Sequence, residues 1–453
     1  MSSSLHQSFT SPSILSKLVP TLPAPSGPYR VGFCDFEYQS PTSIKSSIEN
    51  SGNILLRLFY PTSAHVAKNP LKRPSWSCHP KYLQGYLNFI GIPDALGFPA
   101  IYLLLGQARL PCTERGELAT GDAYPDMASP TFPVLFFSHG LGGMRTTYSQ
   151  ICCDFASYGF IVASLEHLDG TACVSFSHGG AKKIPYARKL PFLSGQEARQ
   201  EQLKYRVGEI KKCMEFISAL HEGNDEIKIY DSTQSAFLPL KQHNNRSPMQ
   251  SQFQQFKGRL NLSATYLSGH SFGATTAIEA AYQFGWGYLK NLKSSLQVKA
   301  VLALDPWMAQ AGEHLFLDPL SRPTLVINTH LFQDQTSIHQ LHRLFRIETA
   351  DYDDFSEKES KMLTILNAGH QAQSDLALLL PSRLLQLPAV LGMFGSLNPE
   401  KTLKLTTQAC REFLQPFLPP QWRGTISPHP NIFHPDPKKR QKDVIIGTSF
   451  YRA

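Results

Sequence analysis

A serine lies between two glycines in the pattern Gly-x-Ser-x-Gly at residues 269–273, with Ser271 at its centre. The short apolar run 262–267 precedes this pattern, and the helix-prone stretch 274–282 follows it. A strand that turns sharply at a serine and enters a helix forms a nucleophile elbow, where glycines leave room for a strained backbone. The pentapeptide alone also occurs by chance as a Gly/Ser turn. Its position between a strand and a helix predicts Ser271 as a nucleophile.

A serine hydroxyl attacks readily only when a base accepts its proton and an acid orients and stabilises that base. Asp305 directly follows the apolar run 298–304. His370 follows the run 362–366 through a short turn. In α/β hydrolases the triad has the chain order Ser, Asp, His, with acid and base on loops just past successive strands. The sequence therefore predicts a catalytic triad of Ser271, Asp305 and His370.

Other residues compete for the acid and base positions. The further acids, none of which directly ends an apolar run, are Asp318, Asp334 and Asp351. His330 is the main alternative base because it also lies just past a strand-like run, 324–328. His370 is preferred since a glycine precedes it and its loop follows the last predicted strand. His339 and His342 have a weak metal-ligand spacing, but a solvated helix face is the preferred interpretation, so no metal site is predicted.

Acyl transfer also requires two backbone N–H groups that stabilise the developing oxyanion. One donor follows the nucleophile, which makes it Phe272, and the other comes from a loop after an earlier strand. The glycine-rich loop 138–143 follows the apolar run 132–137, and its flexible backbone makes Leu141 the predicted second donor. His139 precedes the serine in the chain, so we interpret it as bracing this loop.

The elements that would position these residues form a regular alternation. From residue 132 onward, apolar runs alternate with helical patterns, which predicts an α/β-hydrolase fold with a mostly parallel central sheet and helices on both faces. The runs are 132–137, 160–165, 262–267, 298–304, 324–328 and 362–366. Two earlier runs, 31–36 and 55–60, predict an N-terminal antiparallel hairpin. Apolar residues at helical spacing predict a long helix over 197–221.

Composition divides the 453 residues into three predicted parts. Residues 1–28 are rich in serine and proline and predict a flexible N-terminal arm. Residues 29–418 are predicted to form a single α/β-hydrolase domain. Residues 419–453 are proline-rich and basic and are predicted to form a C-terminal tail.

Charge and cysteine usage exclude several classes of protein. The net charge is +8, and the only cluster of basic residues lies at 438–442, which argues against nucleic-acid binding. No uninterrupted apolar run reaches the roughly 18 residues of a membrane-spanning helix, and the first residues lack the pattern of a secretory signal. The eight cysteines lack the spacing of a disulfide framework or a zinc site. We therefore predict a cytoplasmic protein with reduced cysteines and no cofactor.

Four ordered segments resemble the platelet-activating factor acetylhydrolases of the plasma and intracellular type II family. They are S-H-G-L-G-G-M-R-T-T at 138–147, F-I-V-A-S-L-E-H at 160–167, G-H-S-F-G at 269–273 and L-A-L-D-P-W at 302–307. The resemblance extends over about residues 55–397. It departs at Ala274, where the family usually has glycine, and at Leu168, where it often has arginine.

This resemblance implies a calcium-independent serine phospholipase A2, without metal or cofactor. Such an enzyme hydrolyses the sn-2 acetyl or short or oxidised acyl ester of phospholipids. The resemblance assigns the triad to Ser271, Asp305 and His370, and the oxyanion donors to Leu141 and Phe272. A broader carboxylesterase or lipase, and a catalytically silent lipid-binding module with a hydrolase fold, remain alternatives.

An enzyme that acts on phospholipid must collect its substrate from a lipid surface. Segment 86–106 is strongly apolar with Asp94 as its only charge, and Pro93 and Pro99 are expected to break it into short helices that lie on a membrane or lipid particle. Packing in the core is an equally weighted alternative. A second apolar stretch, 376–397, follows the predicted base and is expected to share this task.

Overall fold

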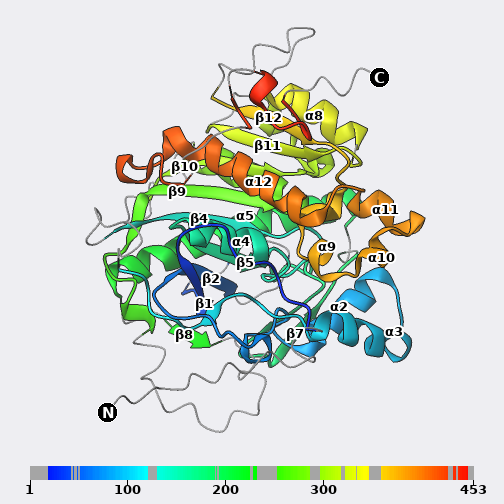
Figure 1. Ribbon diagram of the computed structural model, residues 1–453, viewed down its shortest axis with the longest axis horizontal. Helices are drawn as coiled ribbons and strands as arrows, with labels where there is room; N and C mark the ends of the chain where they lie inside the picture. Colours follow the sequence, from blue (N-terminus) through cyan, green and yellow to red (C-terminus); the bar gives the residue numbers. More distant parts are fainter. Residues whose placement is uncertain are drawn as a thin grey trace, which may run out of the picture.

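The computed structural model describes residues 19–446 with internal gaps. The gaps are residues 42–43, 45–47, 49–51, 121–129, 189, 191–192, 225–227, 232–251, 286–295, 318–321, 333, 346–358, 427–431 and 435–436. Within the described residues, one mixed sheet of 11 strands has the order β13-β12-β11-β10-β9-β4-β5-β2-β1-β3, with β8 paired to β1 (Figure 1).

The centre of the sheet is parallel. Its strands are β4 Phe132–Ser138, β5 Ile161–Glu166, β9 Leu260–His270, β10 Val298–Leu304, β11 Thr324–Thr329 and β12 Lys361–Ile365. Neighbours in this group pair in parallel, and the strands are buried along almost their whole length. Continuous burial is expected where helices cover both faces of a sheet. The predicted parallel sheet is confirmed.

Antiparallel strands complete the sheet at both edges. β1 Arg30–Gln39 and β2 Ile54–Thr62 form the predicted N-terminal hairpin, and β2 pairs antiparallel with β5. β3 Thr113–Glu114 pairs parallel with β1, while β8 Lys228–Asp231 pairs antiparallel with β1. A separate two-stranded sheet joins β6 Val174–Ser177 to β7 Lys182–Pro185.

Two pairs of helices cover the sheet. α4 Ser149–Ser157 and α12 Pro399–Leu414 contact each other on the face that is in front in Figure 1. α5 Gly195–Glu222 and α7 Phe272–Gly285 contact each other on the opposite face. α5 is the predicted long helix. It begins at a capping box between Ser194 and Glu197 and ends at Gly223, whose φ of 68° suits a glycine.

Shorter helices surround this core. The α-helices are α2 Pro80–Ile90, α3 Asp94–Ile101, α8 Gln335–Phe345, α9 Leu376–Leu379, α10 Ser382–Leu385 and α11 Pro388–Phe394. The 3-10 turns are η1 Pro70–Lys72, η5 Met308–Gln310, η6 Glu313–Phe316, η8 His370–Gln373, η9 Gln415–Phe417, η10 Pro420–Trp422 and η11 Pro437–Lys439, and η2 Tyr102–Gly106 is a π-helix. None of the helices in the described residues is long and apolar enough to cross a bilayer.

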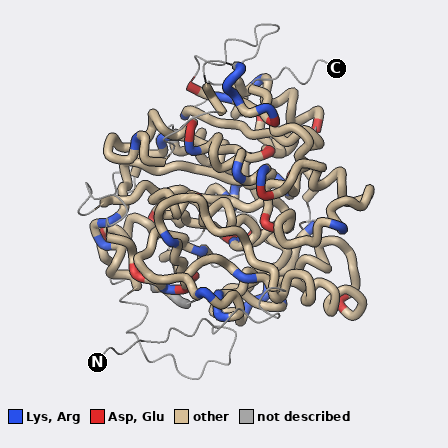
Figure 2. Tube along the Cα trace, in the orientation of Figure 1, with Lys and Arg blue, Asp and Glu red and all other residues tan. Residues whose placement is uncertain are grey.

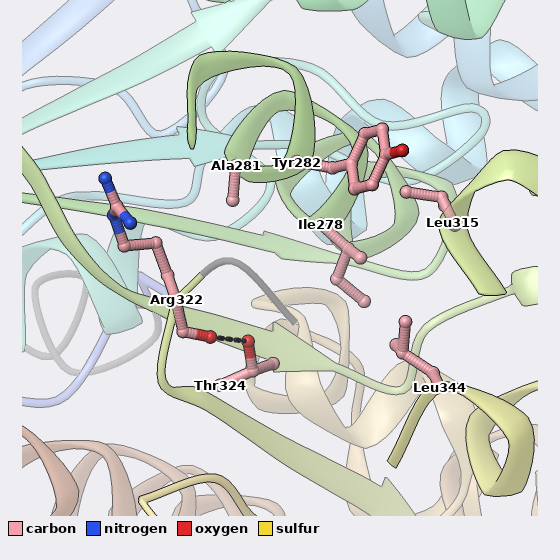
Figure 3. Close-up of a pocket in the computed structure, with 7 residues that line it drawn as sticks. All are labelled: Ile278, Ala281, Tyr282, Leu315, Arg322, Thr324 and Leu344. Atoms are coloured by element: carbon pink, nitrogen blue, oxygen red, sulfur yellow. Dashed lines mark hydrogen bonds between the residues drawn. The ribbon is translucent and has the colours of Figure 1, made fainter. Parts of the chain in front are cut away.

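The helix that follows the Gly-x-Ser-x-Gly pattern is closely packed. A cavity of only about 10 Å³ remains between α7, η6, α8 and the start of β11 (Figure 3). This is about the space that one water molecule needs. Thr324 donates its hydroxyl to the Arg322 carbonyl oxygen at the rim, at 3.0 Å. α7 packs against β9 and β10 on one side and leaves only this small cavity toward β11.

Both predicted terminal boundaries need correction. Leu22, inside the predicted arm, is 2% exposed and donates its N–H to the Arg109 carbonyl oxygen. Trp422, inside the predicted tail, is fully buried. β13 Val444–Ile446 pairs antiparallel with β12 at the edge of the sheet. The packed chain thus extends beyond residues 29–418, whereas residues 1–18 of the predicted arm lie outside the described residues.

Candidate active site

Ser271 lies at the sharp turn between β9 and α7. Its φ of 58° is in the left-handed region, where a residue other than glycine is strained. Besides the hydrogen bonds of the first helical turn, two backbone hydrogen bonds to β10 and to the loop after it hold it there. The Ser271 N–H donates to the Leu304 carbonyl oxygen at 2.9 Å, and the Trp307 N–H donates to the Ser271 carbonyl oxygen at 3.2 Å. Strand β10 and the loop after it therefore fix the strained serine.

The two glycines of the pattern are required by close backbone contacts. A Cβ atom at Gly269 would clash with the Gly273 carbonyl oxygen, and one at Gly273 would clash with the Ser138 carbonyl oxygen. Ala274, by contrast, is fully buried, and its methyl group is part of the main hydrophobic core. The departure from the family pattern at this position is therefore accommodated without a clash at the elbow.

Asp305 and His370 are brought together at the end of the sheet where Ser271 lies. His370 Nδ1 donates to Asp305 Oδ2 at 3.0 Å. The Thr329 N–H donates to Asp305 Oδ1 at 2.7 Å, and its hydroxyl donates to Oδ2. Among the described residues, His370 and Thr329 are the hydrogen-bond partners of the Asp305 carboxylate, and the competing His330 is not one of them. With Nδ1 donating to Asp305, Nε2 of His370 carries the free lone pair of a base.

Of the competing acids, only Asp334 lies in the described residues, and it has a different role. Asp334 accepts hydrogen bonds from the N–H and hydroxyl of Ser337 at the start of α8, which is the role of a helix cap. Asp318 and Asp351 lie outside the described residues.

Burial sets the charge of the pair. It lowers the pKa of His370 because the surrounding protein penalises the imidazolium. It raises the pKa of Asp305, while His270 and the Thr329 donors act in the opposite direction. Phe332 also stacks on the His370 ring, with centroids 3.7 Å apart, and 17% of the His370 side chain is exposed. The imidazole is thus neutral at neutral pH and able to accept a proton.

His270, next to the nucleophile, links the base to the glycine-rich loop. Its Nε2 donates to the His370 carbonyl oxygen at 3.0 Å, and its Nδ1 accepts from the Tyr148 hydroxyl at 2.8 Å. The Tyr148 oxygen in turn accepts from the Gly140 N–H at 3.3 Å. Burial lowers the pKa of His270 to about 3, so it stays neutral in this chain of hydrogen bonds.

The glycine-rich loop lies directly against the serine. A Cβ atom at Gly140 would lie 3.1 Å from Ser271 Cβ. The loop turns at Gly142, which has a φ of 71° and donates its N–H to the Thr171 carbonyl oxygen at 2.8 Å. Among the described residues, the backbone N–H groups of Leu141 and Phe272 donate no hydrogen bond to a carbonyl oxygen of the surrounding turns and loops. Both predicted donors are therefore available for an oxyanion.

A buried arginine that the sequence did not indicate joins the two predicted donor segments. Arg206 of α5 is fully buried, and its Nη1 donates to the His139 carbonyl oxygen at 2.7 Å. Its guanidinium carbon lies 4.8 Å from the centre of the Phe272 ring. Asp169 and Thr171 accept from its other nitrogens. Arg206 therefore contacts the residue before the glycine-rich turn and the residue after the nucleophile.

His139 lies where the predicted bracing role requires. Its Nδ1 donates to the Gly140 carbonyl oxygen at 2.7 Å, and its Nε2 accepts from the His167 N–H at 3.1 Å. Burial and the nearby Arg206 charge lower the pKa of His139 well below its ordinary value. Both ring nitrogens are therefore committed to the shape of the loop.

Asp375 is a second residue that sequence reasoning missed. It is fully buried and accepts hydrogen bonds from Trp76 Nε1 and from the N–H groups of Ser149 and Gln150, at 2.8 to 2.9 Å. Its own N–H donates to the Thr147 carbonyl oxygen at 2.9 Å. Asp375 thus ties the segment after His370 to the N-terminus of α4, which follows the glycine-rich loop.

One cluster in the described part of the chain has donor atoms close enough for a metal ion. It consists of His270, Asp305 and His370, whose potential ligand atoms lie within 4.8 Å of one another. However, His370 Nδ1 is bonded to Asp305, and both nitrogens of His270 are bonded to Tyr148 and to the His370 carbonyl oxygen. The chemistry of this donor set therefore fits proton transfer better than metal binding.

The apolar segment 86–106 divides between core and surface. Tyr86 and Leu87 of α2 are buried, whereas Leu96 in α3 and Leu103 in η2 are 78% and 75% exposed. Pro93 separates α2 from α3 as predicted, but the expectation that Pro99 breaks the segment is wrong, because it lies inside α3. A helix tolerates proline in its first turns or when the lost hydrogen bond is near its end.

Both apolar segments contact the loops of the site. A Cβ atom at Gly142 would overlap the Phe89 ring, so the end of α2 lies on the glycine-rich loop. On the other side, the Gly369 N–H donates to the Phe394 carbonyl oxygen at 3.1 Å, which joins α11 to the loop of His370. In Figure 1, α2, α3, α10 and α11 lie along one side of the molecule.

Comparisons with known proteins identify the family of the chain. A model of the family described as platelet-activating factor acetylhydrolase, isoform II, matches residues 15–425. The platelet-activating factor acetylhydrolase of Cavia porcellus is 27% identical over 88% of this chain and 78% of its own. A Schizosaccharomyces pombe protein named "Putative phospholipase A2" is 26% identical over 87% of this chain and 91% of its own.

A solved structure is similar in fold. The ferulic acid esterase from Streptomyces cinnamoneus has a TM-score of 0.58, with 14% identity over 94% of this chain and 99% of that chain. This likeness confirms the predicted α/β-hydrolase architecture. The resemblance found in the four sequence segments is confirmed by the family match over nearly the whole chain. The chain therefore belongs to the isoform II family of platelet-activating factor acetylhydrolases.

Proposed function

We propose that this protein is a serine phospholipase A2 that hydrolyses the sn-2 ester of platelet-activating factor-like phospholipids. The observation that carries the proposal is the hydrogen-bonded pair of Asp305 and His370 at the same edge of the sheet as a serine held at a φ of 58°. The names of the relatives in Cavia porcellus and Schizosaccharomyces pombe support a phospholipid ester as the substrate. The preferred acyl groups are acetyl and short or oxidised chains.

The proposed reaction uses the residues in fixed roles. His370 accepts the proton of the Ser271 hydroxyl while its oxygen attacks the ester carbonyl, and Asp305 stabilises the imidazolium that forms. The Leu141 and Phe272 N–H groups stabilise the oxyanion. Collapse of this intermediate breaks the ester bond, His370 gives its proton to the leaving lysophospholipid oxygen, and an acyl group stays on Ser271. His370 then accepts a proton from water, whose oxygen attacks the acyl carbon. The bond from this carbon to the Ser271 oxygen breaks, His370 returns its proton to that oxygen, and the acid leaves.

Access to lipid is the second part of the proposal. We define the apolar rim as Ile90, Ile92, Leu96, Leu103, Leu387 and Met393, whose exposed fractions range from 40% to 78%. Figure 2 shows few charged positions along the helices that carry these residues. An exposed apolar surface of this kind is unfavourable in water and is typical of a contact with lipid. The rim would hold the opening to Ser271 against a membrane or lipid particle.

The setting of the enzyme follows from the same features. We infer that one hydrolase domain, built around residues 29–418, contains the catalytic machinery, since one continuous sheet carries every proposed residue. All eight cysteines are buried and free of disulfide bonds. Free buried thiols are typical of proteins in a reducing compartment, which supports a cytoplasmic enzyme that binds membranes peripherally.

A comparison of two substrates tests the reaction. We expect phosphatidylcholine with an sn-2 acetyl group to be hydrolysed much faster than the same lipid with a long sn-2 chain, both in excess chelator. Equal rates would identify a broader carboxylesterase or lipase instead. Lack of any hydrolysis, with lipid binding intact, would identify a silent lipid-binding module. Loss of activity in chelator alone would reveal a metal requirement.

A further inference from the structure

A second cavity lies on the N-terminal hairpin, several strands away from Ser271 in the sheet. Its volume is about 600 Å³, and its lining includes residues of β1, β2 and β3. The charged residues of the lining are Arg57, Arg73, Arg109, Arg115, Asp35 and Glu114. Four arginines against two acids leave a formal charge of +2. None of the residues that line this cavity belongs to the proposed triad or oxyanion hole.

The acid within the cavity is already neutralised. Arg57 donates to Asp35 through Nε at 2.8 Å and Nη2 at 2.6 Å, and Arg145 donates to the same carboxylate at 3.4 Å. Asp35 therefore cannot offset the charges of Arg73 and Arg109, whereas Arg115 lies 4.0 Å from the Glu114 carboxylate in a loose ion pair. Figure 2 shows further basic positions gathered around the hairpin.

Buried arginine nitrogens in the lining lack an acceptor. Arg57 is 2% exposed and its guanidinium packs 4.0 Å above the centre of the Phe33 ring. Since Nε and Nη2 face Asp35, Nη1 points away from that carboxylate, and it is buried without a hydrogen-bond partner among the described residues. Arg109 Nε is likewise buried without a hydrogen-bond partner among the described residues. Both nitrogens are closed off from solvent, so a ligand in the cavity would instead meet the half-buried guanidinium groups of Arg73 and Arg115.

The walls of the cavity are built from paired backbone. The Leu110 N–H donates to the Pro74 carbonyl oxygen and the Trp76 N–H donates to the Ala108 carbonyl oxygen, both at 2.9 Å. Strand β3 continues this wall and pairs with β1 through Phe33 and Glu114. The arginines are thus presented from a preformed cavity of a size that suits a small molecule.

We propose that this cavity binds the phosphate group of a small organic phosphate or of a phosphorylated lipid headgroup. The planar guanidinium matches phosphate oxygens in pairs, and several arginines together suit a group with more than one negative charge. The site is separate from ester hydrolysis and does not depend on the proposed function.

Calorimetric titration of the full chain with inorganic pyrophosphate tests the site. We expect binding by the native protein and by Ser271→Ala alike, and at least about tenfold weaker binding by the double variant Arg73→Gln, Arg115→Gln. Arg57 is kept because its loss would strand the buried Asp35 carboxylate. The control, Lys204→Gln with Arg343→Gln, removes the same charge at side chains that are 59% and 39% exposed, and should change the affinity less than about twofold.

A vesicle experiment separates the two sources of phosphate. Binding that is stronger to phosphatidylcholine vesicles with phosphatidylinositol bisphosphate than to vesicles of phosphatidylcholine alone, with this excess lost in the Arg73→Gln, Arg115→Gln variant, assigns the site to a lipid headgroup. Pyrophosphate binding without such vesicle binding assigns it to a soluble phosphate. The proposal is overturned if the native protein does not bind pyrophosphate, or if the double variant and its control weaken binding equally.

Discussion

At the scale of single residues, two strained and buried groups are central to the proposed chemistry. Ser271 and Asp305 both have positive φ values, 58° and 47°, and each is held by a backbone hydrogen bond to a neighbouring strand. Such strain persists only where the surrounding structure compensates for it, and it is common at functional sites. Ser271 is 8% exposed and Asp305 is 1% exposed, so only substrate that enters the site can reach them.

A buried histidine gives a pH-dependent prediction at this scale. Because the pKa of His139 is depressed in the folded protein, the unfolded chain binds an extra proton below about pH 6.5. The stability contributed by His139 is therefore complete above that pH and is lost as the pH falls. We expect the advantage of the native protein over His139→Gln to shrink by about 1 kcal/mol between pH 6.5 and 5.5.

Urea unfolding of both proteins at the two pH values measures this difference. Using the difference between the proteins removes the contributions of all other titrating groups that the substitution leaves unchanged. A difference that stays constant or grows at the lower pH would show that His139 is protonated in the folded protein.

The proposed catalytic residues could be located from sequence because each one lies at the end of an apolar strand or shortly after it. Ser271, Asp305 and His370 were all located in this way, although their roles stay predictions until they are tested. Arg206 and Asp375 could not be found by the same reasoning. Arg206 lies in a helix in which charged residues are common, and its partners at positions 139, 169 and 171 are brought to it only by the folded chain.

At the scale of elements, α5 connects the sheet to the catalytic loops. The helix carries Arg206 to the carbonyl of His139 and to the ring of Phe272, which flank the two proposed oxyanion donors. A helix is a rigid support, so this contact fixes the relative position of the two segments. We infer that Arg206 is a positioning residue, which acts through the segments of Leu141 and Phe272.

Removing this contact should affect the transition state more than substrate binding. We expect Arg206→Gln to lower kcat by about tenfold to a hundredfold with KM changed less than about threefold, since oxyanion donors act mainly in the transition state. Arg206→Lys should recover part of the loss, because the charge beside Asp169 is kept. Kinetics with a soluble acetyl ester provide the measurement, and Lys204→Gln, an exposed position on the same helix, is the control.

An unchanged kcat in Arg206→Gln would contradict this positioning role. A fall in activity that only followed a fall in folded protein, measured by circular dichroism, would also contradict it, because the effect would then be one of stability.

Most elements could be predicted because their apolar runs are long and regularly spaced. The six central strands and α5 agree with the predicted ranges to within a few residues. β13 was missed because it has only three residues within a basic segment, and it gains its hydrogen bonds only from β12. α3 continues through Pro99 although proline removes one backbone hydrogen bond. This could not be predicted, because local composition does not show whether the chain stays helical after such a loss.

At the scale of the whole molecule, the two apolar segments lie on one side and the arginine-lined cavity lies on the hairpin. The apolar segments are far apart in the sequence, yet α2 and α11 both contact loops of the proposed active site. The sequence could indicate that each segment is apolar. It could not show which side chains face outward, because this depends on packing against Gly142 and the loop of His370.

The apolar rim should control access to lipid without changing the chemistry. We expect the double variant Leu96→Asp, Leu103→Asp to bind phosphatidylcholine vesicles at least about tenfold more weakly, since two exposed leucines no longer enter the bilayer. Its rate on a water-soluble acetyl ester should stay within about twofold of the native rate. Vesicle sedimentation and a colorimetric esterase assay provide the two measurements.

A matched control is Leu317→Asp, which changes a leucine that is 71% exposed on a different part of the surface. Vesicle binding that is unchanged in the double variant, or that falls equally in the control, would exclude the rim as the lipid contact.

The most direct test of the central claim is labelling with a fluorophosphonate probe, which reacts with activated serines. We predict that the native protein is labelled at Ser271, that Ser271→Ala is not labelled, and that Ser263→Ala, an exposed position in β9, is labelled like the native protein. Labelling that survives in folded Ser271→Ala would contradict the assignment of Ser271 as the nucleophile.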